Sequence, residues 1–110
     1  MNYNLFPTHR FEKELKRLVK KYPSLKSEFI LLIKSLSLNP KSGIFIGKDC
    51  YKIRLAIASK GKGKSGGARI ITYVYVKTES VYLLSIYDKS EKEDLKANEL
   101  SLMIDSLELG

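Results

Sequence analysis

The sequence SKGKGKSGGAR, residues 59–69, lies between two runs of residues that alternate like β-strands. Glycine tolerates backbone angles that other residues avoid, so the four glycines let this loop turn tightly and approach a ligand closely. Three lysines and one arginine add positive charge along the same loop. The stretch therefore predicts a loop between two strands that binds phosphate, either as a single group or repeated along a nucleic-acid backbone.

A nucleotide-binding P-loop is a poorer interpretation of the same residues. Gly63, Lys64 and Ser65 match the end of that motif, but Ala58 stands where the motif requires its first glycine. The motif must also open a helix, whereas the residues after this loop alternate like a strand. We therefore do not expect an ATPase.

Length and composition favour a small globular protein. The chain has 110 residues, of which 44% are hydrophobic, and this predicts one domain over residues 1–110. Its net charge is +8, with the positive charge concentrated before residue 90 and an acidic stretch after it. Such a basic centre indicates RNA, DNA or another polyanion as a partner, and a solubilising lysine coat is the alternative.

Cysteine usage and hydropathy point to a cytoplasmic protein without a metal. Cys50 is the only cysteine, so no internal disulfide can form, and no cluster of cysteine and histidine predicts a metal site. The N-terminus does not resemble a signal peptide, and the longest apolar run, residues 29–33, is too short to cross a membrane. We expect no membrane association and no cofactor.

The first part of the chain predicts two helices. Residues 4–7 can form a short extended segment, and Thr8 is a suitable cap for a helix that reaches about Tyr22. Apolar residues at helical spacing continue after Pro23 and predict a second helix over residues 24–38. A tight turn would make the two helices antiparallel.

The pattern then changes to alternation, which predicts a sheet followed by a last helix. Residues 44–46 form a short edge segment, and residues 51–59, 68–76 and 81–87 form three strands of a meander. Ser90 and Glu93 have the spacing of a capping box and predict that the last helix begins there. The expected fold class is α+β, with two N-terminal helices packed on a small antiparallel sheet and a further C-terminal helix.

The meander returns residues 86–89 to the end of the sheet that carries the basic loop. Arg54, on the strand before the loop, joins the same end, as do Tyr87 and Lys89. Each residue alone could be an ordinary surface lysine or a tyrosine at the rim. Like charges gathered at one end destabilise a fold unless an anion offsets them, so the group together favours a binding function.

Three runs of residues are informative together, namely YKIRL at 51–55, GKGKSGGARIITY at 61–73 and YLLSIYDKSEKEDL at 82–95. They resemble the RelE/ParE toxin superfamily, particularly its HigB-like branch. The resemblance extends over nearly the whole chain and implies the RelE-like fold. It also implies the toxin of a type II toxin-antitoxin system, whose partners are a cognate antitoxin and mRNA on the 70S ribosome.

The resemblance further implies a metal-independent endoribonuclease that cuts mRNA in the ribosomal A site and so inhibits translation. In the RelE-like mechanism the ribose 2′-hydroxyl attacks the neighbouring phosphate, giving a 2′,3′-cyclic phosphate and a 5′-hydroxyl. Such a reaction needs a base for the 2′-hydroxyl, cations for the phosphorane-like transition state and an acid for the leaving oxygen.

Arg69 is our first choice for transition-state stabilisation, because a guanidinium holds two phosphate oxygens and keeps its charge. Arg54 assists it. Tyr87 and Lys64 are the candidates for proton transfer, since gathered cations would lower the proton affinity of either, and which is the acid stays open. The expected RNA-backbone contacts are Lys60, Lys62 and Lys89, while Tyr73 stacks on a base or belongs to the core.

Two other functions remain open. A ParE-like toxin would inhibit DNA gyrase through protein contacts without nuclease activity, and a non-catalytic nucleic-acid-binding module would serve only in a repressor complex. The basic loop with Tyr87 and Lys89 favours RNA cleavage, because a gyrase inhibitor has no need of cations that face phosphate. The single histidine, His9, stands at a helix start, and Cys50 has no nearby histidine to activate it, so we expect neither to be catalytic.

Overall fold

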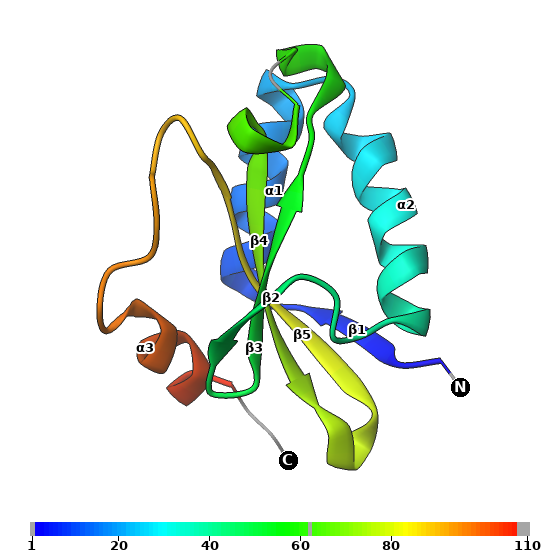
Figure 1. The fold of residues 1–110 in the computed structure, drawn as a ribbon, viewed down its shortest axis with the longest axis vertical. Helices are drawn as coiled ribbons and strands as arrows, with labels where there is room; N and C mark the ends of the chain where they lie inside the picture. Colours follow the sequence, from blue (N-terminus) through cyan, green and yellow to red (C-terminus); the bar gives the residue numbers. More distant parts are fainter. Residues whose placement is uncertain (1, 62, 108–110) are drawn as a thin grey trace.

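A computed structural model describes residues 2–61 and 63–107 of the chain. Its helices and strands follow one another as β1 (Asn4–Pro7), α1 (His9–Lys21), α2 (Leu25–Leu38), β2 (Ile44–Gly47), β3 (Cys50–Leu55), β4 (Ala68–Tyr75), β5 (Ser80–Asp88) and α3 (Glu99–Asp105). Short 3₁₀ turns occupy Ala58–Lys60, Lys64–Gly66 and Val76–Thr78. The predicted α+β class is confirmed (Figure 1).

The N-terminal helix begins where its cap predicts. The Thr8 hydroxyl oxygen accepts a hydrogen bond from the backbone N–H of Phe11 at 3.2 Å, so it satisfies one of the N–H groups that a helix start leaves unpaired. The same hydroxyl donates to the carbonyl of Leu83 at 3.0 Å. Thr8 therefore starts α1 and joins it to β5.

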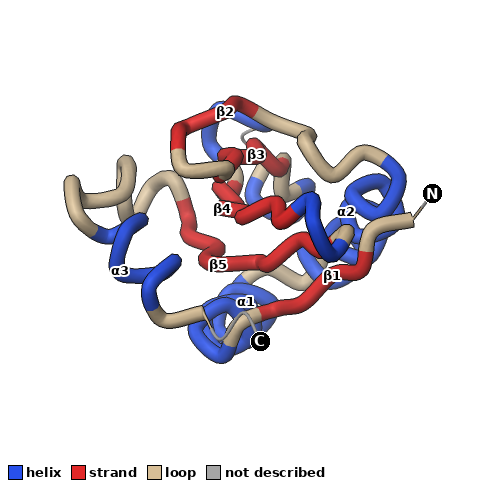
Figure 2. Tube along the Cα trace, turned by 90° about the horizontal axis from the view of Figure 1, so that it is seen from below, coloured by secondary structure: helices blue, strands red, loops and turns tan. Residues whose placement is uncertain are grey.

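The five strands form one mixed sheet in the order β1-β5-β4-β3-β2. Strands β2 to β5 are antiparallel neighbours and make the expected meander. The first segment adds a short strand at the edge, where β1 runs parallel to β5. Figure 2 shows this order across the molecule, with α2 and α3 on opposite sides of the sheet.

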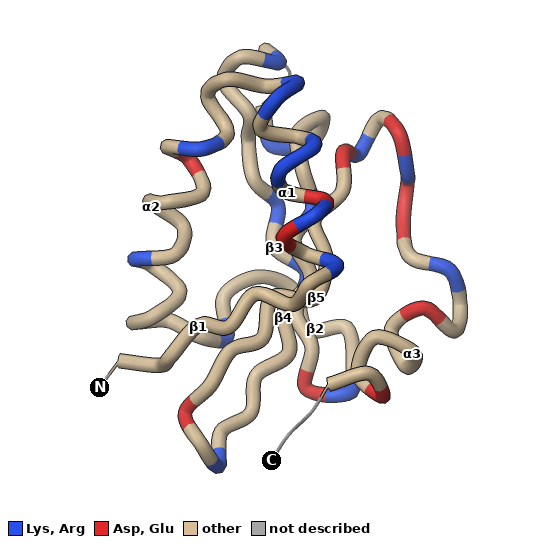
Figure 3. The backbone as a smooth tube through the Cα atoms, turned by 180° about the vertical axis from the view of Figure 1, so that it is seen from behind, with Lys and Arg blue, Asp and Glu red and all other residues tan. Residues whose placement is uncertain are grey.

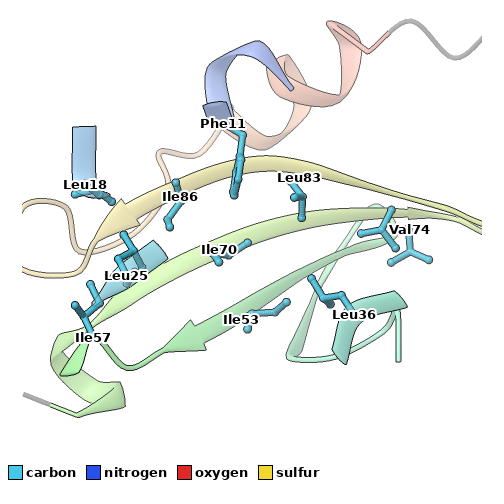
Figure 4. Packing of buried hydrophobic residues seen from close by; sticks show 12 residues of the cluster. Phe11, Leu18, Leu25, Leu36, Ile53, Ile57, Ile70, Val74, Leu83 and Ile86 are labelled. Carbon is cyan, nitrogen blue, oxygen red and sulfur yellow. The ribbon is translucent and has the colours of Figure 1, made fainter. Parts of the chain in front are cut away.

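Two apolar clusters hold these layers together. The larger cluster joins α1 and α2 to one face of the sheet through buried residues such as Phe11, Leu36 and Ile70 (Figure 4). The smaller cluster joins α3 to the opposite face through Met103 and Ile71. The sheet is thus covered on both faces, which is why β4 and β5 are apolar on both sides.

The strand before the basic loop is shorter than its alternating pattern predicts. It ends at Leu55, because side chains at the start of α2 bind the backbone beyond it. The Glu28 carboxylate accepts from the N–H of Ala58 at 2.8 Å, and the Ser24 hydroxyl accepts from the N–H of Ser59 at 2.9 Å. These bonds turn the chain away from the sheet.

The prediction that the last helix begins at Ser90 is wrong. Both the N–H and the hydroxyl of Ser90 donate to the Asp88 carboxylate, at 2.9 and 2.7 Å, so this serine does not cap a helix. The chain continues as turns and loop until α3 begins at Glu99. In the described part of the chain, no helix is both long and apolar enough to cross a membrane.

Candidate functional site

Three functional candidates stand side by side on three neighbouring strands. Arg54 of β3 pairs with Arg69 of β4, and Arg69 pairs with Tyr87 of β5. Residues directly opposite each other in antiparallel strands project from the same face of the sheet. Tyr87 belongs to the apolar cluster under α3, so the row of Arg54, Arg69 and Tyr87 lies on the α3 face.

A hollow of about 280 Å³ opens at the Arg54 end of this row. Three cations line it, namely Lys52 and Arg54 of β3 and Lys64 of the basic loop, together with Gly43, Ile44 and Ile53. Because Lys52 and Arg54 are two residues apart on one strand, they share a face. The structure thus brings Lys64 of the loop to Arg54 of the strand, and we call this feature the cationic hollow.

Lys52 was not among the functional residues expected from the sequence. Its side chain is 21% exposed and pairs with Asp94 at 3.5 Å. The signal was present in the strand, where Lys52 and Arg54 occupy alternate positions. A strand with cations on one face indicates a binding surface more directly than charges in a flexible loop do.

Arg69 is buried beneath the loop instead of projecting into solvent. Its side chain donates to the carbonyl oxygens of Lys64 at 2.8 Å and Ser65 at 3.2 Å, and the residue is 4% exposed. The guanidinium therefore fixes the part of the loop that carries Lys64. Its position in the row also places its charge beside Tyr87, where it offsets part of a rise in the pKa of that residue.

The environment of Tyr87 is the opposite of the one expected. Burial, followed by the nearby Asp94 carboxylate, raises the pKa of Tyr87 to about 12, and the opposing effect of Arg69 is smaller. The hydroxyl donates to Asp94 at 3.5 Å, and the ammonium of Lys92 lies 5.6 Å from the ring centre. Tyr87 therefore keeps its proton at neutral pH and can donate it, although as a weaker acid than an ordinary tyrosine.

Lys60 occupies a structural position, which argues against the expected contact with RNA backbone. Its ammonium forms an ion pair with the buried carboxylate of Asp88 and donates to the Ser90 hydroxyl at 2.9 Å. The Lys60 side chain is 8% exposed. Its positive charge is consequently directed into the fold, on the side where Tyr22, the residue that follows α1, also donates to Asp88.

Lys89 and Tyr73 do not line the cationic hollow. Lys89 is partly exposed and donates to the carbonyl of Glu93 at 3.0 Å. Tyr73 packs in the cluster under α3, with its ring 6.2 Å from that of Tyr82, so it occupies the core position that we had kept open. Lys62 lies outside the described residues.

Gly67 lets the loop close against β3. A Cβ atom at this position would stand 2.1 Å from the carbonyl oxygen of Leu55, where no side chain can fit. Gly63 has φ +60° and ψ −163°, a conformation that is essentially restricted to glycine. The glycines expected to shape the loop therefore do so by close approach at Gly67 and by backbone angle at Gly63.

Cys50 and His9 have environments that suit the structural roles expected for them. Cys50 is fully buried, and burial followed by the charge of Asp49 raises the pKa of its thiol to about 12, which disfavours the nucleophilic thiolate. His9 is exposed at the start of α1. Within residues 2–61 and 63–107, no three side chains of His, Cys, Asp or Glu form a group that could hold a metal.

Comparison with solved structures identifies the fold. A mutant of the Escherichia coli toxin RelE in the free state aligns over 84% of this chain and 90% of its own, with a TM-score of 0.62 and 22% sequence identity. The chain has the RelE-like fold. The isolated E. coli RelE toxin aligns over 94% of this chain and 96% of its own, with a TM-score of 0.50 and 21% identity.

The intact E. coli RelBE toxin-antitoxin complex also matches, over 78% of this chain and 95% of the matched chain, with a TM-score of 0.48 and 22% identity. No protein-family model matches the sequence. The RelE-like fold is therefore recognised through shape at low sequence identity. It places the cationic hollow, the Arg54, Arg69 and Tyr87 row and the basic loop at one end of its sheet.

Proposed function

We propose that this protein is the toxin of a type II toxin-antitoxin system and a ribosome-dependent mRNA endoribonuclease. The observation that carries the proposal is the cationic hollow, which is lined by Lys52, Arg54 and Lys64. Arg54 also belongs to the row that contains Tyr87. Three cations around a small hollow suit a phosphate group, which has several oxygens to contact. The RelE-like fold supports the same function.

The chemistry assigns a role to each group. Arg54 and Lys52 bind the scissile phosphate and stabilise the added negative charge of the transition state. Tyr87, which keeps its proton at neutral pH, donates that proton to the leaving 5′ oxygen. Lys64 is the other candidate for proton transfer, and it can accept the proton of the attacking 2′-hydroxyl only after its own ammonium has lost a proton. Arg69 holds the loop in place and adds positive charge from beneath.

The partners follow from the same surface. The substrate is mRNA in the A site of the 70S ribosome, and a cognate antitoxin is the protein partner. A basic site attracts an acidic protein segment that covers it, as complementary surfaces do in other complexes. We place this activity in the cytoplasm, where ribosomes translate.

The deciding experiment is a primer-extension map of the 5′ ends of an mRNA translated in a purified system. The wild-type protein should create new ends at ribosome-occupied codons, and these ends should be absent without ribosomes. Arg54→Ala is the better test variant, because Arg54 is exposed whereas loss of the buried Arg69 would also release the loop.

Lys77→Ala is the matched control. Lys77 is an exposed cation in the turn after β4, at the opposite end of the sheet from the loop. The Lys77→Ala variant should cleave mRNA like the wild type, whereas the cleavage rate of Arg54→Ala should fall by at least about tenfold. An intact message while translation continues would contradict the proposal, and gyrase inhibition would then be measured as the alternative.

A further inference from the structure

The segment that joins β5 to α3, residues 89–98, crosses the α3 side of the molecule and carries alternating charges (Figure 3). We call it the strap. Ion pairs hold its first half, since Glu91 pairs with Arg17 of α1 at 2.6 Å and Lys92 pairs with Glu99, the first residue of α3, at 2.7 Å. The partners of these pairs are partly or largely exposed. Exposed ion pairs contribute little to stability, so these two pairs alone would resist a movement of the strap only weakly.

One carboxylate of the strap reaches the functional site. Asp94 lies 3.5 Å from the ammonium of Lys52 and accepts the hydrogen bond of the Tyr87 hydroxyl, also at 3.5 Å. Its orientation is fixed locally by the N–H of Leu95, which donates to it at 2.8 Å. Asp94 therefore brings a negative charge between two groups to which we assign contacts with RNA.

Both contacts of Asp94 with the site are long, and its side chain is 65% exposed. A stable buried ion pair would have shorter distances and little solvent access. The geometry instead resembles a loosely held anion at the edge of a cationic site. A phosphate has more charge and more acceptor oxygens than a carboxylate, so it can compete for the same donors.

We propose that Asp94 is an internal competitor of the RNA phosphate, and that its carboxylate occupies the position between Lys52 and Tyr87 until an incoming phosphate displaces it. The inference rests on the proposed function, because that function assigns Lys52 and Tyr87 to the RNA phosphate. It adds a regulatory contact: the strap restrains the site, and substrate binding releases the strap.

Inorganic pyrophosphate is a suitable probe, because its binding needs neither ribosomes nor catalysis. NMR titration would follow the Tyr87 ring, the Lys52 side chain and the Leu95 amide. Asp94→Asn keeps the shape of the side chain and its bond to Leu95 but removes the charge. We expect this variant to bind pyrophosphate about 2- to 5-fold more tightly than the wild type, as the loss of one exposed ion pair allows.

Glu93→Gln is the matched control, since Glu93 is an exposed carboxylate of the same strap whose described contact is made through its backbone carbonyl. It changes the net charge equally and should alter the affinity by less than about 1.5-fold. In a Lys52→Gln background, Asp94→Asn should have no larger effect than the control, because the ion pair of Asp94 with Lys52 has already been lost.

Equal affinities of Asp94→Asn and Glu93→Gln, or no pyrophosphate-dependent shift at Lys52 and Tyr87 in either the wild type or Asp94→Asn, would overturn the competition. Failure of the proposed function would be seen in a different experiment. It would appear as an intact message on ribosomes, whatever the result with pyrophosphate.

Discussion

The environment of Tyr87 determines whether its hydroxyl can donate or accept a proton. Its raised pKa, about 12, means that the hydroxyl is protonated across the neutral range, so it can donate but not accept a proton there. Tyr87→Phe removes only the oxygen, which makes a single long hydrogen bond to Asp94. We expect RNA cleavage to fall by about 10²- to 10⁴-fold, the usual contribution of a proton donor.

The measurement for Tyr87→Phe is the single-turnover rate on ribosome-bound mRNA, accompanied by thermal unfolding. The free energy of unfolding should change by less than about 1 kcal/mol, because the ring and its packing are retained. Full cleavage activity in this variant would exclude Tyr87 as the acid. A general loss of stability would instead show that the hydroxyl has a structural role.

Asp88, the neighbour of Tyr87, contributes to stability. Burial alone would raise its pKa, but hydrogen bonds from Lys60, Tyr22 and Ser90 outweigh that effect and hold the pKa far below its usual range. Asp88→Asn should lower the free energy of unfolding by about 3 kcal/mol, because it leaves the ammonium of Lys60 without its charged partner. Urea unfolding of both proteins measures this difference.

The depressed pKa of Asp88 determines how the free energy of unfolding changes with pH. The contribution of this carboxylate is present above its unfolded pKa, near 3.8, and is lost as the pH falls below it. Asp88→Asn should therefore flatten the acid limb of the stability curve. Glu91→Gln, which removes the same charge from an exposed ion pair, should cost less than about 1 kcal/mol. Equal losses in the two variants would refute the buried role of Asp88.

Among the elements, the basic loop depends on Gly67 more than on Gly61. A Cβ atom at Gly67 would collide with the Leu55 carbonyl, whereas one at Gly61, with φ +75°, meets no atom within 4 Å. Gly67→Ala should therefore displace the loop and remove most RNA cleavage. Gly61→Ala should cost only about 1 kcal/mol, from the strained backbone angle, and keep its activity. NMR shifts of residues 64–66 would report the displacement.

How far the sequence predicts each element depends on the range of the interactions that define it. The helices 9–21 and 25–38 follow from apolar spacing and a local cap, and the sheet follows from alternation. The end of β3 and the start of α3 depend on contacts that are remote in sequence or compete locally. Glu28 captures the backbone at Ala58, and Asp88 takes the Ser90 hydroxyl away from capping.

The site shows the same division. The meander brings Arg54 and Tyr87 to one end of the sheet, and this convergence could be predicted from strand order alone. Burial could not. The sequence does not reveal that Lys60 pairs with Asp88, or that Asp94 and burial together raise the pKa of Tyr87, because both effects need the positions of segments that the sheet pattern leaves undetermined.

For the molecule as a whole, the net charge of +8 includes two groups of cations that could meet RNA. One is the cationic hollow. The other is the outer side of α1, where Lys13, Lys16 and Lys20 are exposed, on a helix that packs against the opposite face of the sheet (Figure 3). Both surfaces attract RNA at long range, but only cations that contact phosphates directly release bound counterions.

The salt dependence of RNA binding separates the two surfaces. For a single-stranded RNA, each phosphate contact contributes about 0.7 to the slope of log affinity against log salt. Replacing Lys52, Arg54 and Lys64 by glutamine should reduce the slope by about 2, whereas the matched triple change of Lys13, Lys16 and Lys20 should leave it nearly unchanged. Fluorescence anisotropy with a 2′-O-methyl RNA, which cannot be cleaved, provides the measurement. If the slope falls more in the α1 variant than in the variant of the hollow, the RNA binds to the helix face. The cationic hollow is then not the site where the phosphate is held.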